Sequence, residues 1–307
     1  MNLRRLKYFI KIVDTGSLTQ ASEILHIAQP ALSQQLATLE HEFDQQLLVR
    51  TRTGVTPTEA GQVLYRHAQL MLRQFAQAKS DVKNSGRALS GQVSVGLAPG
   101  TAASALALPL LKTVHGRHPD IVLHINENLG TTLCEVVKNG RMDMAVLYGG
   151  KRVVQGLTFD HLLNEELFVV APNGMLSDEG QVTLKELRDI DLLLPRSHNY
   201  LRNYVDEAFA GQQMAPRVVA EIESSATLAS AVASGVGATV LPVSAARAVA
   251  ASIPGHLYRI VSPTIEVPLA LCVSDHLPLS EPAQAVKGIV LELVEHLELA
   301  AGLHSIH

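Results

Sequence analysis

Cysteine and long apolar runs are both scarce in this sequence of 307 residues. Cys134 and Cys272 are its two cysteines and form no motif, so a disulfide framework is excluded and two buried free thiols in a reducing compartment are expected. No segment reaches the roughly 18 consecutive apolar residues of a membrane-spanning helix. The chain starts directly in an amphipathic segment without the form of a signal peptide, so a cytoplasmic protein is expected.

Catalytic motifs are missing as well. There is no G-x-S-x-G nucleophile elbow and no G-x-x-x-x-G-K-[ST] phosphate loop. His115 and His118 lie three residues apart, near His124, but solvated or core histidines explain them better than a metal site. Gly235–Gly237 resembles a fragment of a glycine-rich loop, yet it lacks a preceding strand and is better explained as a turn. We therefore expect no catalytic residue, no metal and no cofactor.

Residues 17–39 predict two short helices joined by a tight turn, an arrangement that can place the second helix in the major groove of DNA. Ser17 is a helix N-cap with Gln20 three residues later, as in a capping box. Pro30 suits the first position of the second helix, where its missing N–H costs nothing. The inner stripes of both helices are apolar at helical spacing: Leu18, Ala21, Leu25, Leu32, Leu36 and Leu39.

The opposite face of the second helix carries uncharged hydrogen-bonding side chains: Gln29, Ser33, Gln34 and Gln35. Gln can bind adenine through two hydrogen bonds, and Ser can bind several base edges. Two helices that merely pack together would give the same pattern. The flanks favour DNA binding, because residues 3–13 predict a supporting helix and residues 46–55 predict a two-stranded wing. Arg50 and Arg52 near the wing tip suit phosphate contact, with solvated surface charges as the alternative.

Positive charge is scarce where a DNA-binding segment usually has it. Residues 1–60 hold six Lys and Arg and six Asp and Glu, so their net charge is zero. Residues 61–90 add five positive charges and one negative charge, and residues 91–307 carry −8. A single copy should therefore bind DNA weakly, and dimerisation is expected.

The segment from Thr56 to Ser85 predicts a long helix. Thr56 is expected to cap it, with Pro57 at the first helical position. Its apolar residues form a heptad-like seam: Leu64, Ala68, Met71, Phe75, Ala78 and Val82. Roughly 28 residues span about 40 Å, longer than a helix inside a small domain, so two such helices are expected to pair. A helix that packs on its own domain is the alternative. Residues 86–91 are expected to form a hinge at a domain boundary.

Residues 92–301 alternate strand and helix patterns, which favours a parallel-rich α/β fold. Strands are expected at 93–97, 121–125, 143–148, 167–171, 191–194, 238–241 and 267–273, and helices at 101–114, 131–139, 224–234 and 281–299. The late strand and closing helix are expected to return to the first half of this region.

In such sheets ligands bind beyond the carboxyl ends of strands, where helices begin. Three expected helix starts offer backbone N–H groups and hydroxyls to an anion or polar metabolite. The candidate residues are Gly100, Thr101, Thr131, Thr132 and Ser224. Taken singly, each hydroxyl is explained more simply by ordinary helix capping.

The chain resembles the LysR-type transcriptional regulators over essentially its whole length. The residues that carry this resemblance are 17–22, 29–36, 39–40, 47–50, 58–61, 91–96, 140–145 and 235–242. A narrower resemblance, to family members that control nitrogen assimilation, lies in residues 4–9, 25–30, 98–103 and 221–224.

The resemblance implies an α/β protein overall, with three parts. These are a winged helix-turn-helix at 1–58, a dimerising linker helix and hinge at 59–90, and a periplasmic-binding-protein-like effector domain at 91–307. The effector domain would have one subdomain at about 91–162 and 267–301 and another at about 163–266. A small-molecule effector would lie between them, although a ligand-independent member is also consistent with the pattern.

As a family member, the chain is expected to be a cytoplasmic homodimer or homotetramer that binds promoter DNA, works with RNA polymerase, and activates or represses transcription. The DNA-binding positions are Ser17, Thr19, Gln20, Gln29, Pro30, Ser33, Gln34, Arg50 and Arg52. Thr53 stands where the family usually has its second wing arginine, with Arg52 one place earlier. The alternative function is a periplasmic-type small-molecule binding protein, or an enzyme on that fold, with an accessory helical module. The missing signal peptide and catalytic residues count against it.

Overall fold

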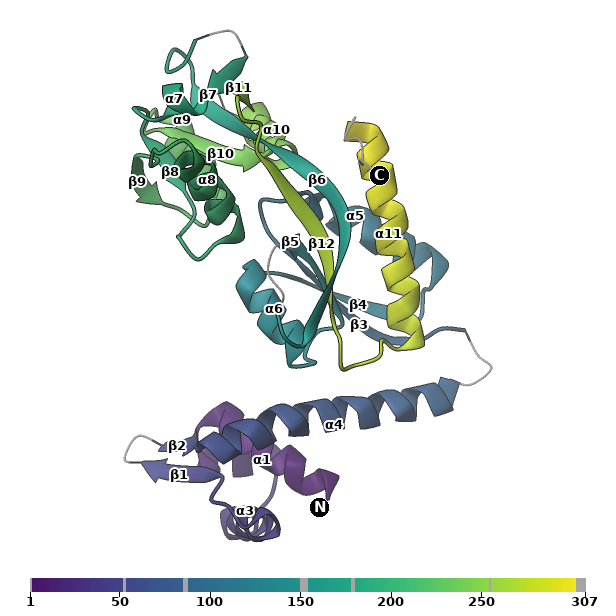
Figure 1. The fold of residues 1–307 in the computed structure, drawn as a ribbon. Helices are drawn as coiled ribbons and strands as arrows, with labels where there is room; N and C mark the ends of the chain where they lie inside the picture. Colours follow the sequence, from purple (N-terminus) through teal and green to yellow (C-terminus); the bar gives the residue numbers. More distant parts are fainter. Residues whose placement is uncertain are drawn as a thin grey trace. The chain divides into compact units, whose positions relative to one another are not determined.

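The chain folds into two compact units divided after residue 87, as a computed structural model shows (Figure 1). The structure describes residues 2–51, 54–84, 88–149, 154–177, 180–253 and 255–301. Each unit has a hydrophobic core of its own. The expected hinge at 86–91 lies partly outside the described residues, and Gly91 already begins a strand.

The N-terminal unit contains the predicted helix pair. Its helices are α1 (Leu3–Thr15), α2 (Leu18–Leu25) and α3 (Gln29–Phe43), followed by a hairpin of β1 (Leu48–Thr51) and β2 (Gly54–Pro57). Ser17 caps α2 as predicted, since its hydroxyl accepts a hydrogen bond from the Gln20 N–H at 3.3 Å. Gln20 does not complete a capping box, because the Ser17 N–H donates to the Thr15 hydroxyl instead. Pro30 takes the second rather than the first position of α3. The predicted inner stripes are buried or, for Leu25, partly buried against the core.

The long helix α4 (Glu59–Asn84) begins later than expected. Thr56 and Pro57 belong to β2, where they pair with Val49 and Leu48. Thr58 caps the helix instead: its hydroxyl accepts from the Gly61 N–H at 3.0 Å and donates to the Gln46 carbonyl at 2.7 Å. The expected N-cap at Thr56 is therefore wrong, because hairpin pairing takes that residue.

Gly61 lies where α4 passes very close to the chain that enters the hairpin. A Cβ atom added at Gly61 would lie 2.0 Å from the Leu47 carbonyl oxygen, a backbone atom that cannot swing away. Replacing Gly61 by Ala should therefore lower the free energy of unfolding of the N-terminal unit by about 1–3 kcal/mol. Urea denaturation followed by circular dichroism measures this loss.

Gly116→Ala is the matched control for that substitution. Gly116 lies in a helix of the C-terminal unit, and an added Cβ would meet nothing within 4 Å. This change should raise stability, by up to about 1 kcal/mol, because alanine favours a helix more than glycine does. Equal effects of the two changes would contradict the close-contact explanation.

Only part of the expected α4 seam is available for pairing. Leu64 and Ala68 are 7% and 0% exposed in the core of their own unit. Next to them the Tyr65 hydroxyl donates a hydrogen bond to Asp14 of α1, and burial together with this carboxylate raises the pKa of Tyr65 to about 12. For this first stretch the alternative is right: the helix packs on its own domain. The later seam residues are at least partly exposed: Met71, Phe75, Ala78 and Val82.

The C-terminal unit consists of two halves whose sheets share the long strand β6 (Leu157–Pro172). The first sheet has the order β4-β3-β5-β12-β6, with β3 at Gly91–Leu97, β4 at Ile121–Glu127, β5 at Met144–Tyr148 and β12 at Glu266–Ser274. The second sheet has the order β9-β8-β10-β6, with β9 at Val218–Glu221, β8 at Leu192–Leu194 and β10 at Ala238–Pro242. On its other side β6 pairs with β11 (Gly255–Val261), which pairs with β7 (Gln181–Thr183).

Residues 157–166 of β6 pair with β12, and residues 167–172 pair with β10 and β11. In Figure 1 the two long strands β6 and β12 run together between the halves. The late strand β12 inserts between β5 and β6, and α11 (Glu281–Ala301) packs on α5 (Ala102–Arg117) and β3. The fold is less parallel than expected, because β12 and β6 run antiparallel to their neighbours.

The remaining helices are α6 (Gly130–Lys138), α7 (Leu184–Leu187), α8 (Tyr200–Gly211), α9 (Ser225–Ala233) and α10 (Val243–Ser252). Cys134 and Cys272 are buried free thiols in one small apolar cluster, as expected. Among the described helices, none combines the length and apolarity needed to cross a bilayer. The described residues also contain no group of three or more His, Cys, Asp or Glu placed to hold a metal ion.

Candidate functional site

The residues predicted to contact DNA lie on α2, α3 and the hairpin. Thr19, Gln20, Gln29, Pro30, Gln34 and Arg50 are exposed, and Ser17 and Ser33 are half-buried. Arg52, the second expected wing arginine, lies outside the described residues, as does Thr53. The buried stripe of Leu32, Leu36 and Leu39 fixes which face of α3 turns outward. Gln29 and Gln34 therefore present amide groups on the exposed face of α3.

Arg50 connects the hairpin to α3. Its Nη2 atom donates a hydrogen bond to the Ser33 hydroxyl at 2.9 Å. At the other end of the hairpin, the Glu40 carboxylate accepts from the N–H groups of Leu47 and Leu48 at 2.9 and 3.2 Å. A hollow of about 350 Å³ lies between these two attachments. The wing is thus held to α3 at two points.

Arg5 of α1 holds the same helix from its other side, a contact that sequence reasoning missed. Its Nε donates to the Gln35 Oε1 at 3.0 Å, and its Nη1 forms an ion pair with Glu42. Gln35, which was expected among the outward polar residues, is therefore bound inside the unit. The available signal is weak: Arg5 directly precedes the buried Leu6 on an amphipathic helix.

The arrangement presents a helix face of neutral donors and acceptors beside an arginine-bearing hairpin. The major groove of DNA is wide enough for an α-helix such as α3, and a guanidinium next to that helix can reach the phosphate backbone. The part-buried contacts of Glu40 hold the hairpin on α3, and those of Arg5 hold α3 on α1. This is the geometry required of a base-reading helix with a backbone-binding wing.

A second candidate site is a cavity of about 500 Å³ between the two halves of the C-terminal unit. Its lining includes residues from the starts of four helices, α5, α6, α8 and α9, whose positive dipole ends favour polar or anionic groups. Gly130 allows close approach there, since an added Cβ would lie 3.1 Å from the Tyr200 ring. The cavity can hold a small polar molecule in contact with both halves.

The predicted effector residues divide into two groups. Gly100, Thr101 and Thr131 line the cavity, whereas Thr132 and Ser224 do not. Thr101 is buried, and its hydroxyl donates to the Ala98 carbonyl and accepts from the Ala103 N–H. The Ser224 hydroxyl caps α9 by accepting from the Thr227 N–H at 3.3 Å. Helix capping is therefore what these two hydroxyls do.

Several lining residues were not singled out from the sequence: Tyr148, Arg196, His198, Asn199, Tyr200, Glu221 and Glu223. Most of them surround α8, a helix the sequence analysis missed. Asn199 caps it by accepting from the Leu201 N–H at 2.9 Å. Glu223 accepts from the Arg196 N–H at 3.1 Å and so fixes the loop before α8. An Asn directly before a helical segment was the signal available.

Two family models match the chain. Residues 3–62 match the bacterial regulatory helix-turn-helix protein, lysR family, and residues 86–295 match the LysR substrate binding domain. Two curated relatives are identical to this chain at about half of the aligned positions. The nitrogen assimilation regulatory protein nac of Klebsiella aerogenes is 52% identical over 300 residues, 97% of each chain. The protein of the same name from Escherichia coli strain K12 is 50% identical over 295 residues, 96% of this chain and 95% of that one.

Solved structures of similar fold include two full-length proteins. A full-length cysteine-to-aspartate variant of OxyR from Pseudomonas aeruginosa has a TM-score of 0.73 at 22% identity, covering 96% of this chain and 95% of that chain. CbnR complexed with its target DNA has a TM-score of 0.67 at 20% identity, covering 96% and 99%. The family assignment decides against the alternative of a periplasmic-type binding protein or enzyme. With both family models matched and the helix-turn-helix in place, the chain belongs to the LysR family of DNA-binding transcriptional regulators.

Proposed function

We propose that this protein controls nitrogen assimilation genes by binding their promoters. The observation that carries this is 52% identity, over 97% of both chains, to a nitrogen assimilation regulatory protein. The alignment extends over nearly the whole chain, so it includes both the base-reading helix and the C-terminal unit. Residues 1–58 bind DNA, residues 59–90 join two copies, and residues 91–307 regulate them.

Base reading is assigned to Gln29 and Gln34, and positioning to the residues around them. Both amides are exposed on α3 and can each bind one adenine through two hydrogen bonds. Thr19, Gln20 and Pro30 are exposed beside them. Ser17 caps the start of α2 through its hydroxyl. Ser33 holds Arg50 by the 2.9 Å hydrogen bond, and Arg50 binds the DNA backbone, joined by Arg52.

Arg50→Ala should weaken binding to promoter and random DNA to a similar extent. One phosphate contact fewer should reduce the slope of log affinity against log salt by about 1 per bound half-site. Fluorescence anisotropy titrations at several salt concentrations measure both quantities. A loss confined to promoter DNA, with an unchanged salt slope, would instead make Arg50 a base-reading residue.

The protein acts in the cytoplasm as a homodimer or homotetramer and works with RNA polymerase at the promoter. The net charge of zero over residues 1–60 supports dimer formation, because two copies double the number of DNA contacts. The exposed apolar residues in the second half of α4 supply the pairing surface. The cavity of the C-terminal unit is proposed as the site for a small-molecule effector, bound at the start of α5, by the backbone of Gly100 and Thr101, and at the start of α6, by Thr131.

Genome-wide footprinting in the source bacterium, with and without nitrogen limitation, tests the proposal. We expect bound sites to be enriched upstream of genes for nitrogen uptake and assimilation. Bound promoters without that enrichment would overturn the nitrogen role while leaving the DNA-binding activity intact.

A further inference from the structure

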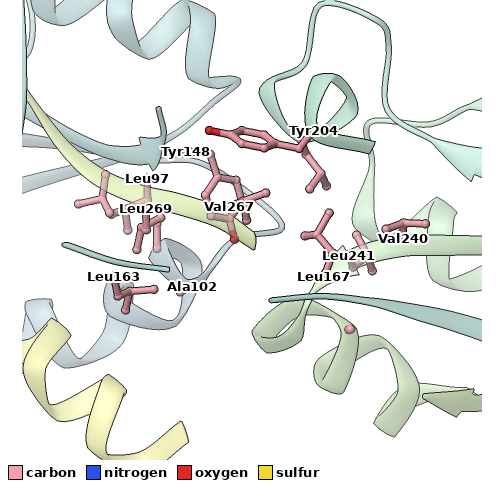
Figure 2. Packing of buried hydrophobic residues seen from close by; sticks show 14 of the residues in the cluster. Leu97, Ala102, Tyr148, Leu163, Leu167, Tyr204, Val240, Leu241, Val267 and Leu269 are labelled. Atoms are coloured by element: carbon pink, nitrogen blue, oxygen red, sulfur yellow. The ribbon is translucent and has the colours of Figure 1, made fainter. Parts of the chain in front are cut away.

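A buried carboxylate lies at the junction of the two halves of the C-terminal unit. Glu165 is fully buried, and it is the one buried carboxylate in the described part of the chain. It stands on β6 opposite Val267, directly before the point where β6 changes from pairing with β12 to pairing with β10 and β11. Figure 2 shows the buried residues on either side of this junction, with Leu163 and Leu269 in one group and Leu167 and Val240 in the other.

Three hydrogen-bond donors surround the Glu165 carboxylate, and they come from both halves. The Ala102 N–H, at the start of α5, donates to Oε2 at 3.1 Å. The Ser244 N–H, in the first turn of α10, donates to Oε1 at 3.3 Å. The Tyr148 hydroxyl, at the end of β5, donates to Oε2. The two helix starts each carry a partial positive charge, and these charges stabilise a buried carboxylate that pairs with no cationic side chain in the hydrogen bonds and ion pairs of the described residues.

The α10 start depends on this carboxylate. Its N-cap is Pro242, whose side chain makes no capping hydrogen bond. The first-turn N–H groups of a buried helix require acceptors, and Glu165 supplies one to α10 and one to α5. Helix α5 packs on β3 and β4 of the first half, and α10 packs on β10 and β11 of the second. A single side chain thus joins one helix from each half.

We propose that Glu165 is an internal latch that holds the two halves of the C-terminal unit in one relative orientation. Tyr148 connects the latch to the cavity, because it is one of the cavity's lining residues and its hydroxyl binds Glu165. Burial and the adjacent Glu165 carboxylate raise the pKa of Tyr148 well above its usual value, so the hydroxyl stays protonated and remains a donor. A ligand that displaces Tyr148 would weaken the latch. This last step rests on the proposed effector role of the cavity, whereas the latch itself does not.

Glu165→Gln in the full-length protein tests the latch. Glutamine keeps the volume but turns an N–H2 group toward one N–H donor, and the neutral oxygen that remains accepts a weaker hydrogen bond than a carboxylate oxygen does, so both helix starts are affected. Hydrogen exchange measured by mass spectrometry should be about 10-fold faster, or more, at the starts of both α5 and α10. Exchange in α2 and α3 should not change. Faster exchange at only one helix start, or at neither, overturns the proposal.

Two further variants keep the test decisive. Ser244→Ala is the matched control, because its hydroxyl is buried without a hydrogen-bond partner among the described atoms, while the N–H bound to Glu165 remains. It should leave exchange at both helix starts unchanged. If Glu165→Gln does not fold, Tyr148→Phe provides the test. Without the Tyr148 hydroxyl the carboxylate of Glu165 is no longer held in place and can turn away from the two N–H groups, so hydrogen exchange at both helix starts should be several-fold faster. Exchange that is unchanged at either start overturns the latch. None of these measurements uses DNA or a ligand, so failure of the nitrogen role would not affect them.

Discussion

Phe75→Glu should convert the protein from a dimer to a monomer and weaken promoter binding at least about 100-fold, because the avidity of two linked half-sites is lost. Phe75 is 51% exposed on α4, and Val82, two helical turns further, is 80% exposed. These two side chains belong to the part of the α4 seam that is exposed and so available to a second copy. Leu64 and Ala68, earlier in the seam, are buried in the core of the N-terminal unit. Sedimentation velocity gives the oligomeric state, and anisotropy titration gives the promoter affinity.

Ala76→Glu is the control for that substitution. Ala76 is exposed on the same helix and receives the same charge, but it lies about 100° around the axis from Phe75. It should remain dimeric with nearly normal promoter affinity. If Phe75→Glu also stays dimeric, the pairing surface lies elsewhere on the chain.

Replacing both Gln29 and Gln34 by Ala should abolish most of the discrimination between promoter and random DNA. A good bidentate contact to the correct base contributes about 1–3 kcal/mol of discrimination, so two contacts per half-site predict a loss of about 30-fold or more in the affinity ratio. Affinity for random DNA and its salt dependence should change little, because neither side chain is charged. Competition titrations at fixed salt measure the ratio.

Gln92→Ala provides the matched amide deletion. Gln92 is exposed on β3 of the C-terminal unit, far in sequence from the helix-turn-helix, and its loss should leave the affinity ratio unchanged. An equal loss of affinity for promoter and random DNA in the double variant would mean that these amides bind the backbone and not the bases.

Local patterns were sufficient for the helix-turn-helix. Ser17 caps α2 through the Gln20 N–H three residues later, and the buried leucines of α3 recur every three or four residues, so local spacing alone predicts both. The start of α4 was misplaced for a non-local reason: Thr56 fits a helix N-cap equally well, and only its pairing with Val49 decides otherwise. The engagement of Gln35 by Arg5 is similarly invisible, since the two residues lie 30 positions apart.

The C-terminal unit was predicted less completely, for physical reasons that its residues show. The first part of β6 includes Asp160, Asn164 and Glu166 on exposed or half-exposed positions, so it lacks the apolar run that revealed 167–171. In α10 the residues are mostly Ala, Ser and Val, which give little periodic contrast. Thr101 and Ser224 were assigned to an effector although both cap helices, because capping and ligand binding favour the same residue types at the same place.

The insertion of β12 between β5 and β6 also determines the order in which the C-terminal unit can fold during synthesis. All five residues of β5 are buried, and its outer edge pairs with Leu269 to Val273 near the end of the chain. A ribosome adds residues from the N-terminus, so the first half stays incomplete while the whole second half is made. Throughout that interval β5 presents an apolar strand with one open edge, which is a template for intermolecular pairing. Nascent chains stalled before β12 should therefore be clients of chaperones, whereas completed chains should not.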